Sequence, residues 1–180
     1  AIRISCNTIA VQTLTDDVGL RTGYDYLKNN FEFSTIVEDD IAQATALGGI
    51  TKGVYNLELT AAFASLANSG TYTDPVLYTE ILDHDGNVLI DNTAPATHEA
   101  VKDSTAYLLT SAMEDVVNSG TGYGAGLSNM ATAGKTGSTD DYVDRWFVGF
   151  TPYYTAGIWG GYDANKSMSG YGSWHLSIWN

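Results

Sequence analysis

The stretch Ala131-Thr132-Ala133-Gly134-Lys135-Thr136-Gly137-Ser138-Thr139 is the part of this 180-residue chain that decides its fold. It combines a cation, hydroxyl side chains and glycines in an extended segment. Alternate side chains of a strand share a face, so Thr136 and Ser138 point the same way, and Gly137 allows a close approach by a neighbouring chain. Hydroxyls and an ammonium group that converge on a groove suit a carboxylate, and an exposed strand N–H there suits an oxyanion. An edge strand that ends in a polar turn is the competing interpretation.

The composition indicates one acidic domain with enough apolar residues for a core. Hydrophobic residues make up 44% of the chain, and 8 basic residues against 21 acidic ones give a net charge of −13. This charge disfavours nucleic acid and anionic membrane surfaces as partners. Cys6 is the only cysteine, so the chain has no internal disulfide framework. We interpret Cys6 as a small buried residue at a helix start rather than a nucleophile, because no histidine stands near it.

Hydrophobic periodicity and stop signals predict most of the secondary structure. Asn7 is the expected N-cap of the first helix. We expect helices over residues 5–14, from 16 or 17 to about 28, over 57–67 and 101–117, and from 174 onward, with strands over 76–84, 87–91, 131–139, 146–151 and 155–162.

Two loops resemble ligand-binding motifs, but each has a simpler interpretation. Residues 83–87 hold acidic and amide groups near a glycine, yet lack the further ligands of a calcium loop, and Asp-Gly between strands favours a hairpin turn. The glycine-rich residues 120–126 lack the Gly-Lys-Ser/Thr ending of a phosphate-binding loop. We interpret them as a flexible connector, and we expect neither a metal nor a cofactor.

Further segments place the opening stretch in a wider context. Ser5-Cys6-Asn7 lies near the start of the chain, and the segments 46–54, 57–70, 144–152 and 156–163 follow in order. Together they resemble the transpeptidase domain of penicillin-binding proteins, whose signature motifs are S-x-x-K, an S-x-N type triplet and K-T-G. The segments 46–70 are similar to the class A, bifunctional branch. The resemblance covers residues 5 to about 179 and implies an α+β fold (an α/β sandwich), in which helices flank an antiparallel sheet as in serine β-lactamases.

The S-x-x-K motif is missing from the sequence. No serine stands three residues before Lys28, Lys52, Lys102, Lys135 or Lys166. In the family this serine precedes the S-x-N triplet, and the chain starts only four residues before Ser5. We therefore expect residues 1–180 to be the C-terminal part of a transpeptidase domain, without the N-terminal part that carries S-x-x-K.

Two alternatives stay open at this stage. A homologue that evolved without the nucleophile would be a non-catalytic module that binds peptidoglycan or a partner protein. A serine hydrolase that uses Ser5 has less support, because no base lies within the same motif.

The resemblance implies a role for each motif residue. The parent protein would be a serine-type D,D-transpeptidase, which cross-links peptidoglycan stem peptides by acyl transfer from D-alanyl-D-alanine and binds penicillin. Ser5 would relay a proton to the leaving amine, Lys135 would set the electrostatic field, and the Ser138 N–H would form half of the oxyanion hole. Asn7 would bind the acyl-side amide, and two hydroxyls of the K-T-G strand would hold the terminal carboxylate. The implied substrate-binding set is Asn7, Thr136, Gly137, Ser138 and Thr139.

The same resemblance implies partners and a location. We expect a peptidoglycan stem peptide or a β-lactam as ligand, and the missing N-terminal half of the same domain as a structural partner. The expected location is the extracytoplasmic face of a bacterial cell membrane, with an N-terminal anchor outside this chain as the only membrane contact. Without the nucleophile, we expect the 180 residues alone to be inactive.

Overall fold

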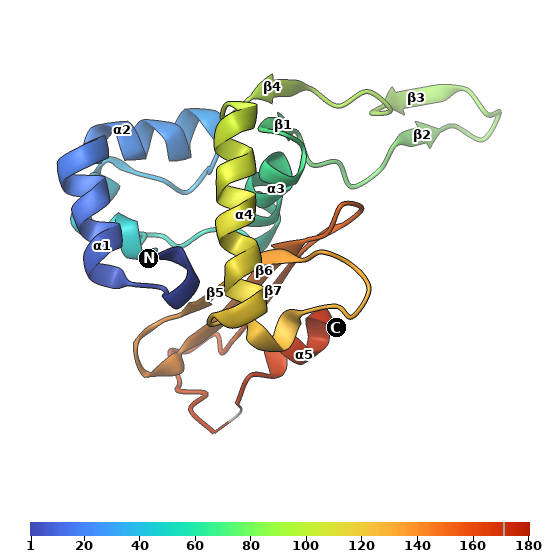
Figure 1. Ribbon diagram of the computed structural model, residues 1–180. Coiled ribbons are helices and arrows are strands. Elements are labelled where there is room, and N and C mark those ends of the chain that lie inside the picture. The colour runs from blue at the N-terminus through green and yellow to red at the C-terminus, as the bar shows by residue number, and fades with distance from the viewer. Residues whose placement is uncertain (171) are drawn as a thin grey trace.

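The computed structural model describes residues 1–170 and 172–180, which form helices and small antiparallel sheets (Figure 1). This architecture confirms the expected α+β fold. Its helices are α1 (Asn7–Gln12), α2 (Leu20–Asp25), α3 (Asn56–Ala67), α4 (Asp103–Ser119) and α5 (Trp174–Trp179), and its strands are β1 (Thr71–Thr73), β2 (Glu80–Leu82), β3 (Val88–Asp91), β4 (Thr97–Glu99), β5 (Ala133–Ser138), β6 (Asp144–Phe150) and β7 (Thr155–Gly161).

The largest sheet has the order β5-β6-β7, with antiparallel neighbours throughout. In its register, Lys135 lies opposite Val148 and Thr136 lies opposite Phe147. Within the described residues β5 pairs only with β6, so it is an edge strand. Residues 147–150 of β6 are all buried, because helices cover both faces of the sheet.

Helix α4 packs against both faces of this sheet, together with α3 on one face and α5 on the other. On one face Phe150 contacts Met113 of α4, and Phe63 and Leu66 of α3 pack against this cluster. On the other face Phe147 contacts Val117 at the end of α4 and Leu176 of α5. Figure 1 shows α4 running past the edge of the sheet, so its last turn lies close to β5.

Helix α4 places the segment after it beside β5. Its buried residues recur at helical spacing, at Ala106, Met113, Val116 and Val117. The helix ends at Gly120, whose N–H donates to the Val116 carbonyl. The predicted helices 57–67 and 101–117 are therefore confirmed with small shifts at their ends.

The N-terminal region differs in detail from the sequence prediction. Asn7 was expected as an N-cap, but Cys6 occupies that position with extended backbone and Asn7 is the first helical residue. Cys6 is half-buried rather than buried. The second helix begins at Leu20, and π-helical turns over Thr13–Val18 and Tyr26–Asn30 flank it. The reason for the late start is Gly19, whose φ of 87° breaks the helical path.

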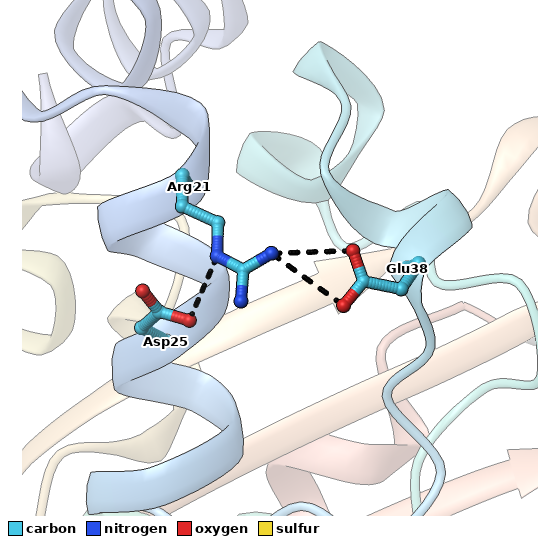
Figure 2. Close-up of polar contacts among 3 residues, drawn as sticks. All are labelled: Arg21, Asp25 and Glu38. Atoms are coloured by element: carbon cyan, nitrogen blue, oxygen red, sulfur yellow. Dashed lines mark hydrogen bonds and ion pairs between the residues drawn. The ribbon is translucent and has the colours of Figure 1, made fainter.

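An ion-pair group joins α2 to the following loop. Figure 2 shows the Arg21 guanidinium between Asp25 and Glu38. Arg21 Nε lies 3.1 Å from Asp25 Oδ1, and Arg21 Nη1 lies 3.2 Å from Glu38 Oε2. These pairs raise the pKa of Arg21, first through its hydrogen bond to Asp25. Because all the partners are well exposed, the group orients the loop more than it stabilises the fold.

A β2–β3 hairpin projects from the body of the molecule (Figure 1). The Asp83 carboxylate closes its turn by accepting hydrogen bonds from the N–H groups of Asp85 and Asn87. The predicted hairpin is thus confirmed, although its first strand begins at Glu80 rather than near Val76. The pairing of β1 with β4 was not predicted from the sequence.

We expect Gly70→Ala to destabilise the fold by about 2–4 kcal/mol. Gly70 has a φ of 88°, and an added Cβ would collide with the backbone carbonyl of Val101. Gly48→Ala is the matched control, because Gly48 has a φ of 82° but no neighbour within 4 Å. Urea unfolding measures the stability lost in each variant. The loss in Gly48→Ala gives the cost of a positive φ alone, and the additional loss in Gly70→Ala gives the cost of the collision. Equal losses of stability in the two variants would contradict the predicted collision.

Candidate active site

The side chains of Lys135 and Ser5 meet although 130 positions separate them in the sequence. Lys135 Nζ donates a hydrogen bond to Ser5 Oγ at 2.8 Å, and a second one to the Thr136 carbonyl at 3.0 Å. The structure therefore brings together the S-x-N type triplet and the K-T-G strand. This contact is the centre of the candidate site.

A tight turn presents the Ser5 hydroxyl to Lys135. Ile2–Ile4 form a 3-10 turn, η1, and Ser5 closes it with φ 53° and ψ 51°. A non-glycine residue in this left-handed region is uncommon and is kept only where its surroundings hold it. Here the Arg3 carbonyl accepts a hydrogen bond from the Thr121 N–H at 3.2 Å, which fastens the turn to the segment after α4. Gly120 permits this approach, because a Cβ there would collide with Arg3.

Burial changes the protonation chemistry of Lys135. Its ammonium group is removed from water, and this desolvation lowers the pKa of Lys135 below the ordinary lysine value. Among the described residues Lys135 forms no ion pair with an acidic side chain, so no local ion pair offsets its burial. A cation of this kind attracts an incoming anion and also exchanges protons more readily than a surface lysine.

Thr136 points its hydroxyl at a second hydroxyl. Thr136 Oγ1 lies 2.7 Å from Thr121 Oγ1, and either atom can be the donor. Thr136 shares a sheet face with Phe147, its register partner, and this is the face next to the end of α4. Thr121 thereby reaches β5 from the glycine-rich segment 120–126, whose sequence predicts only a flexible connector.

The free edge of β5 presents backbone donors to the site. The Thr139 N–H donates to the Asp144 carbonyl, so residue 139 is oriented toward β6. Because strand residues alternate, Thr136 and Ser138 direct their N–H groups away from β6. The hydrogen bond from Lys135 to the Thr136 carbonyl agrees with this orientation, since that carbonyl also lies on the open side.

The other predicted residues take different positions. Ser138 is exposed at the end of β5, and Gly137 lies against Trp146, where a Cβ would approach the Trp146 Cβ to 3.1 Å. Asn7 is exposed and lines a surface hollow with Gln12 and other residues of α1. Within residues 1–170 and 172–180, no hydrogen bond joins the Asn7 side chain to β5.

Thr139 is engaged with Asp144 rather than free. Its hydroxyl lies 3.1 Å from Asp144 Oδ2 and accepts the Asp144 N–H at 2.8 Å. Trp159 Nε1 donates to the other carboxylate oxygen at 2.9 Å. This network links β5, β6 and β7 at the end of the sheet. We therefore interpret Thr139 as a structural residue beside the site, a role that the sequence alone did not indicate.

Sequence reasoning missed Thr121 and Asp144. A weak signal existed for Thr121, because a threonine between Gly120 and Gly122 directly after a helix is well placed for contacts at close range. The described part of the chain contains no group of three His, Cys, Asp or Glu residues that could hold a metal ion. None of its helices is long and apolar enough to cross a membrane.

Comparison with known proteins identifies the family of this site. The family model described as the penicillin binding protein transpeptidase domain matches residues 1–159. The chain belongs to this transpeptidase domain family. The chain is 38% identical over 181 residues to penicillin-binding protein 4 of Bacillus subtilis, covering 99% of the chain and 28% of that protein. It is 37% identical over 175 residues to penicillin-binding protein 1A of Aquifex aeolicus, covering 93% of the chain and 22% of that protein.

A solved structure has the same fold. Penicillin-binding protein 1A of Haemophilus influenzae superimposes with a TM-score of 0.79 at 20% identity, covering 98% of the chain and 33% of that protein. The similarity to proteins named 1A supports the class A branch of the penicillin-binding proteins. The chain spans about a quarter of the length of the curated relatives it matches.

Proposed function

We propose that this chain supplies the proton relay and the carboxylate-binding strand of a D,D-transpeptidase that cross-links peptidoglycan stem peptides and binds β-lactams. The observation that carries the proposal is the 2.8 Å hydrogen bond from Lys135 Nζ to Ser5 Oγ. It joins a cation to a hydroxyl next to an open strand edge, and acyl transfer at a carboxylate-terminated peptide needs these groups together.

The proposed reaction assigns each step to an atom. A serine from outside these 180 residues gives its hydroxyl proton to a base that also lies outside them and attacks the penultimate D-alanyl carbonyl, and the Ser138 N–H at the free edge stabilises the oxyanion. Ser5 then passes a proton to the departing amine of the terminal D-alanine. Lys135 holds the Ser5 hydroxyl in position and can replace the proton that Ser5 has given up. The C–N bond to the terminal D-alanine breaks and leaves an acyl-serine ester. The amine of a second stem peptide then attacks this ester and forms the new amide bond, while the C–O bond to the serine breaks and one amine proton returns to the serine oxygen.

The carboxylate of the terminal D-alanine binds on the same strand. Thr136 donates its hydroxyl to this carboxylate, and Ser138 lies on the same face two residues later. Lys135 adds positive charge within an acidic protein, whose net charge of −13 would otherwise repel the ligand. In this proposal the reaction takes place on the extracytoplasmic side of the membrane, where peptidoglycan is found.

Labelled penicillin tests the proposal in the complete gene product that contains this chain. We expect one penicillin per polypeptide, attached to a serine outside these 180 residues, and competition by an acetylated peptide ending in D-alanyl-D-alanine. Intact-mass and peptide-mass spectrometry locate the attachment. Binding of the peptide without any adduct would favour the non-catalytic module, and attachment to Ser5 would favour the serine hydrolase.

The lowered pKa of Lys135 predicts an unusual pH profile. A lysine with a lowered pKa loses its positive charge at a lower pH than the ordinary value of about 10.4. We therefore expect the second-order rate of penicillin acylation to fall on the alkaline side below this value, since that rate reports groups of the free enzyme. In Lys135→Arg the side chain stays charged, so the alkaline fall in the acylation rate should disappear, even if this variant is slower at neutral pH. An unchanged alkaline limb in Lys135→Arg would exclude Lys135 as its source.

A further inference from the structure

We propose that Thr121 is a positioning residue, which donates its hydroxyl proton to Thr136 and so directs the Thr136 proton toward the substrate carboxylate. The inference rests on the proposed function, and it adds a residue from a segment that carries none of the three signature motifs. Its starting observation is the 2.7 Å separation of Thr121 Oγ1 and Thr136 Oγ1.

Proton counting gives this contact a direction when an anion is bound. A threonine hydroxyl has one proton to donate and lone pairs that accept. An ionised carboxylate only accepts, so Thr136 must give its single proton to the ligand. The hydrogen bond between the two threonines then persists only if Thr121 is the donor. Thr121 thus sets the rotation of the Thr136 hydroxyl and polarises it, because hydrogen bonds in a chain strengthen one another.

The backbone holds Thr121 in place for this role. Its N–H donates to the Arg3 carbonyl, and the Gly122 N–H donates to the Val116 carbonyl at the end of α4. Gly122 is buried, and a Cβ there would come within 3.2 Å of Val116 and 3.4 Å of Phe147. The hydroxyl of Thr121 therefore approaches β5 from a fixed backbone.

The same residue connects the two halves of the candidate site. Through its backbone Thr121 contacts the turn that presents Ser5, and through its side chain it contacts Thr136, the residue after Lys135 in β5. Thr121 thus fixes the position of Thr136, and of a substrate bound to Thr136, relative to the turn that carries Ser5.

Peptide binding to the complete gene product tests the proposal. The probe is an acetylated peptide ending in D-alanyl-D-alanine, compared with the same peptide ending in an uncharged amide, and the dissociation constants are measured by NMR titration. We expect Thr121→Val to weaken the carboxylate peptide about three- to tenfold, the size of one ordinary hydrogen bond. The amide peptide should lose much less, and Thr121→Ser, which restores the hydroxyl, should recover wild-type binding.

A double-mutant cycle shows whether Thr121 acts through Thr136. The variant with both Thr121→Val and Thr136→Val should bind no more weakly than Thr136→Val alone, because the first residue has nothing left to position. Thr105→Val, at an exposed site in the first turns of α4, is the control for a threonine-to-valine change.

Each outcome decides between the proposals. Additive losses in the cycle, or equal losses for the acid and amide peptides, would overturn the positioning role and leave the proposed function standing. If Thr121→Val binds the carboxylate peptide as tightly as the unmodified protein, the positioning role is likewise wrong and the proposed function still stands. If the unmodified protein does not distinguish the acid from the amide peptide, the carboxylate site itself is wrong, and both proposals fail.

Discussion

Lys135→Ala should slow penicillin acylation of the complete gene product by at least about two decades. The substitution removes the donor to Ser5 Oγ together with the positive charge of the candidate site. One hydrogen bond to a charged group contributes about 1.5–3 kcal/mol, which alone amounts to about one to two decades. The lost electrostatic field adds to this figure.

Stopped-flow acylation with a fluorescent penicillin measures the effect. Lys102→Ala is the control, because Lys102 is an exposed lysine ahead of α4 and far from Ser5 in the sequence. The fold should survive Lys135→Ala. Burying the charged ammonium group costs free energy, and the substitution removes that cost together with the group. A folded Lys135→Ala protein that is acylated at the wild-type rate would remove Lys135 from the proposed mechanism.

The parts of the fold that the sequence predicted are those with strong local signals. Helices α3 and α4 have apolar residues at helical spacing and clear stops at residues 68–70 and at Gly120. Strands β5, β6 and β7 follow one another with a short connection at Pro152, so their pairing is local. Such elements are fixed by neighbours in the sequence, and their bounds were predicted to within a few residues.

The parts that the sequence did not predict depend on distant contacts. Strands β1 and β4 are three residues each, and their pairing joins Thr71 to Glu99 across a long excursion that includes the hairpin. The start of α1 was misplaced because the left-handed turn at Ser5 leaves Cys6 as the N-cap. That turn is held by the Thr121 N–H, which no local pattern reveals.

The candidate site divides in the same way. The motifs predicted that Ser5 and Lys135 belong together, and the structure brings them into contact. The motifs did not predict that Thr139 is engaged with Asp144, or that Thr121 contacts Thr136. Both contacts arise from how segments pack around the ends of α4 and β5. The assigned roles of Asn7 and Ser138 stay predictions.

The 180-residue chain on its own should form no covalent adduct with penicillin. The sequence contains no serine with a lysine three residues later, and loss of the nucleophile costs on the order of a millionfold in rate in a serine protease. Ser5 is the strongest substitute, because it is exposed and touches Lys135. In that contact, however, the charged lysine is a donor to the Ser5 oxygen, and a charged ammonium group cannot remove a proton.

Intact-mass spectrometry after prolonged incubation measures this result, and Ser5→Ala is the matched variant. We expect the same unmodified mass in both proteins at neutral pH. The lowered pKa of Lys135 makes alkaline pH the most demanding condition, because a neutral amine can act as a base toward Ser5. A penicillin adduct that appears as the pH rises, and is lost in Ser5→Ala, would show that Ser5 and Lys135 form a nucleophile–base pair. The proton-relay role proposed for Ser5 would then be wrong.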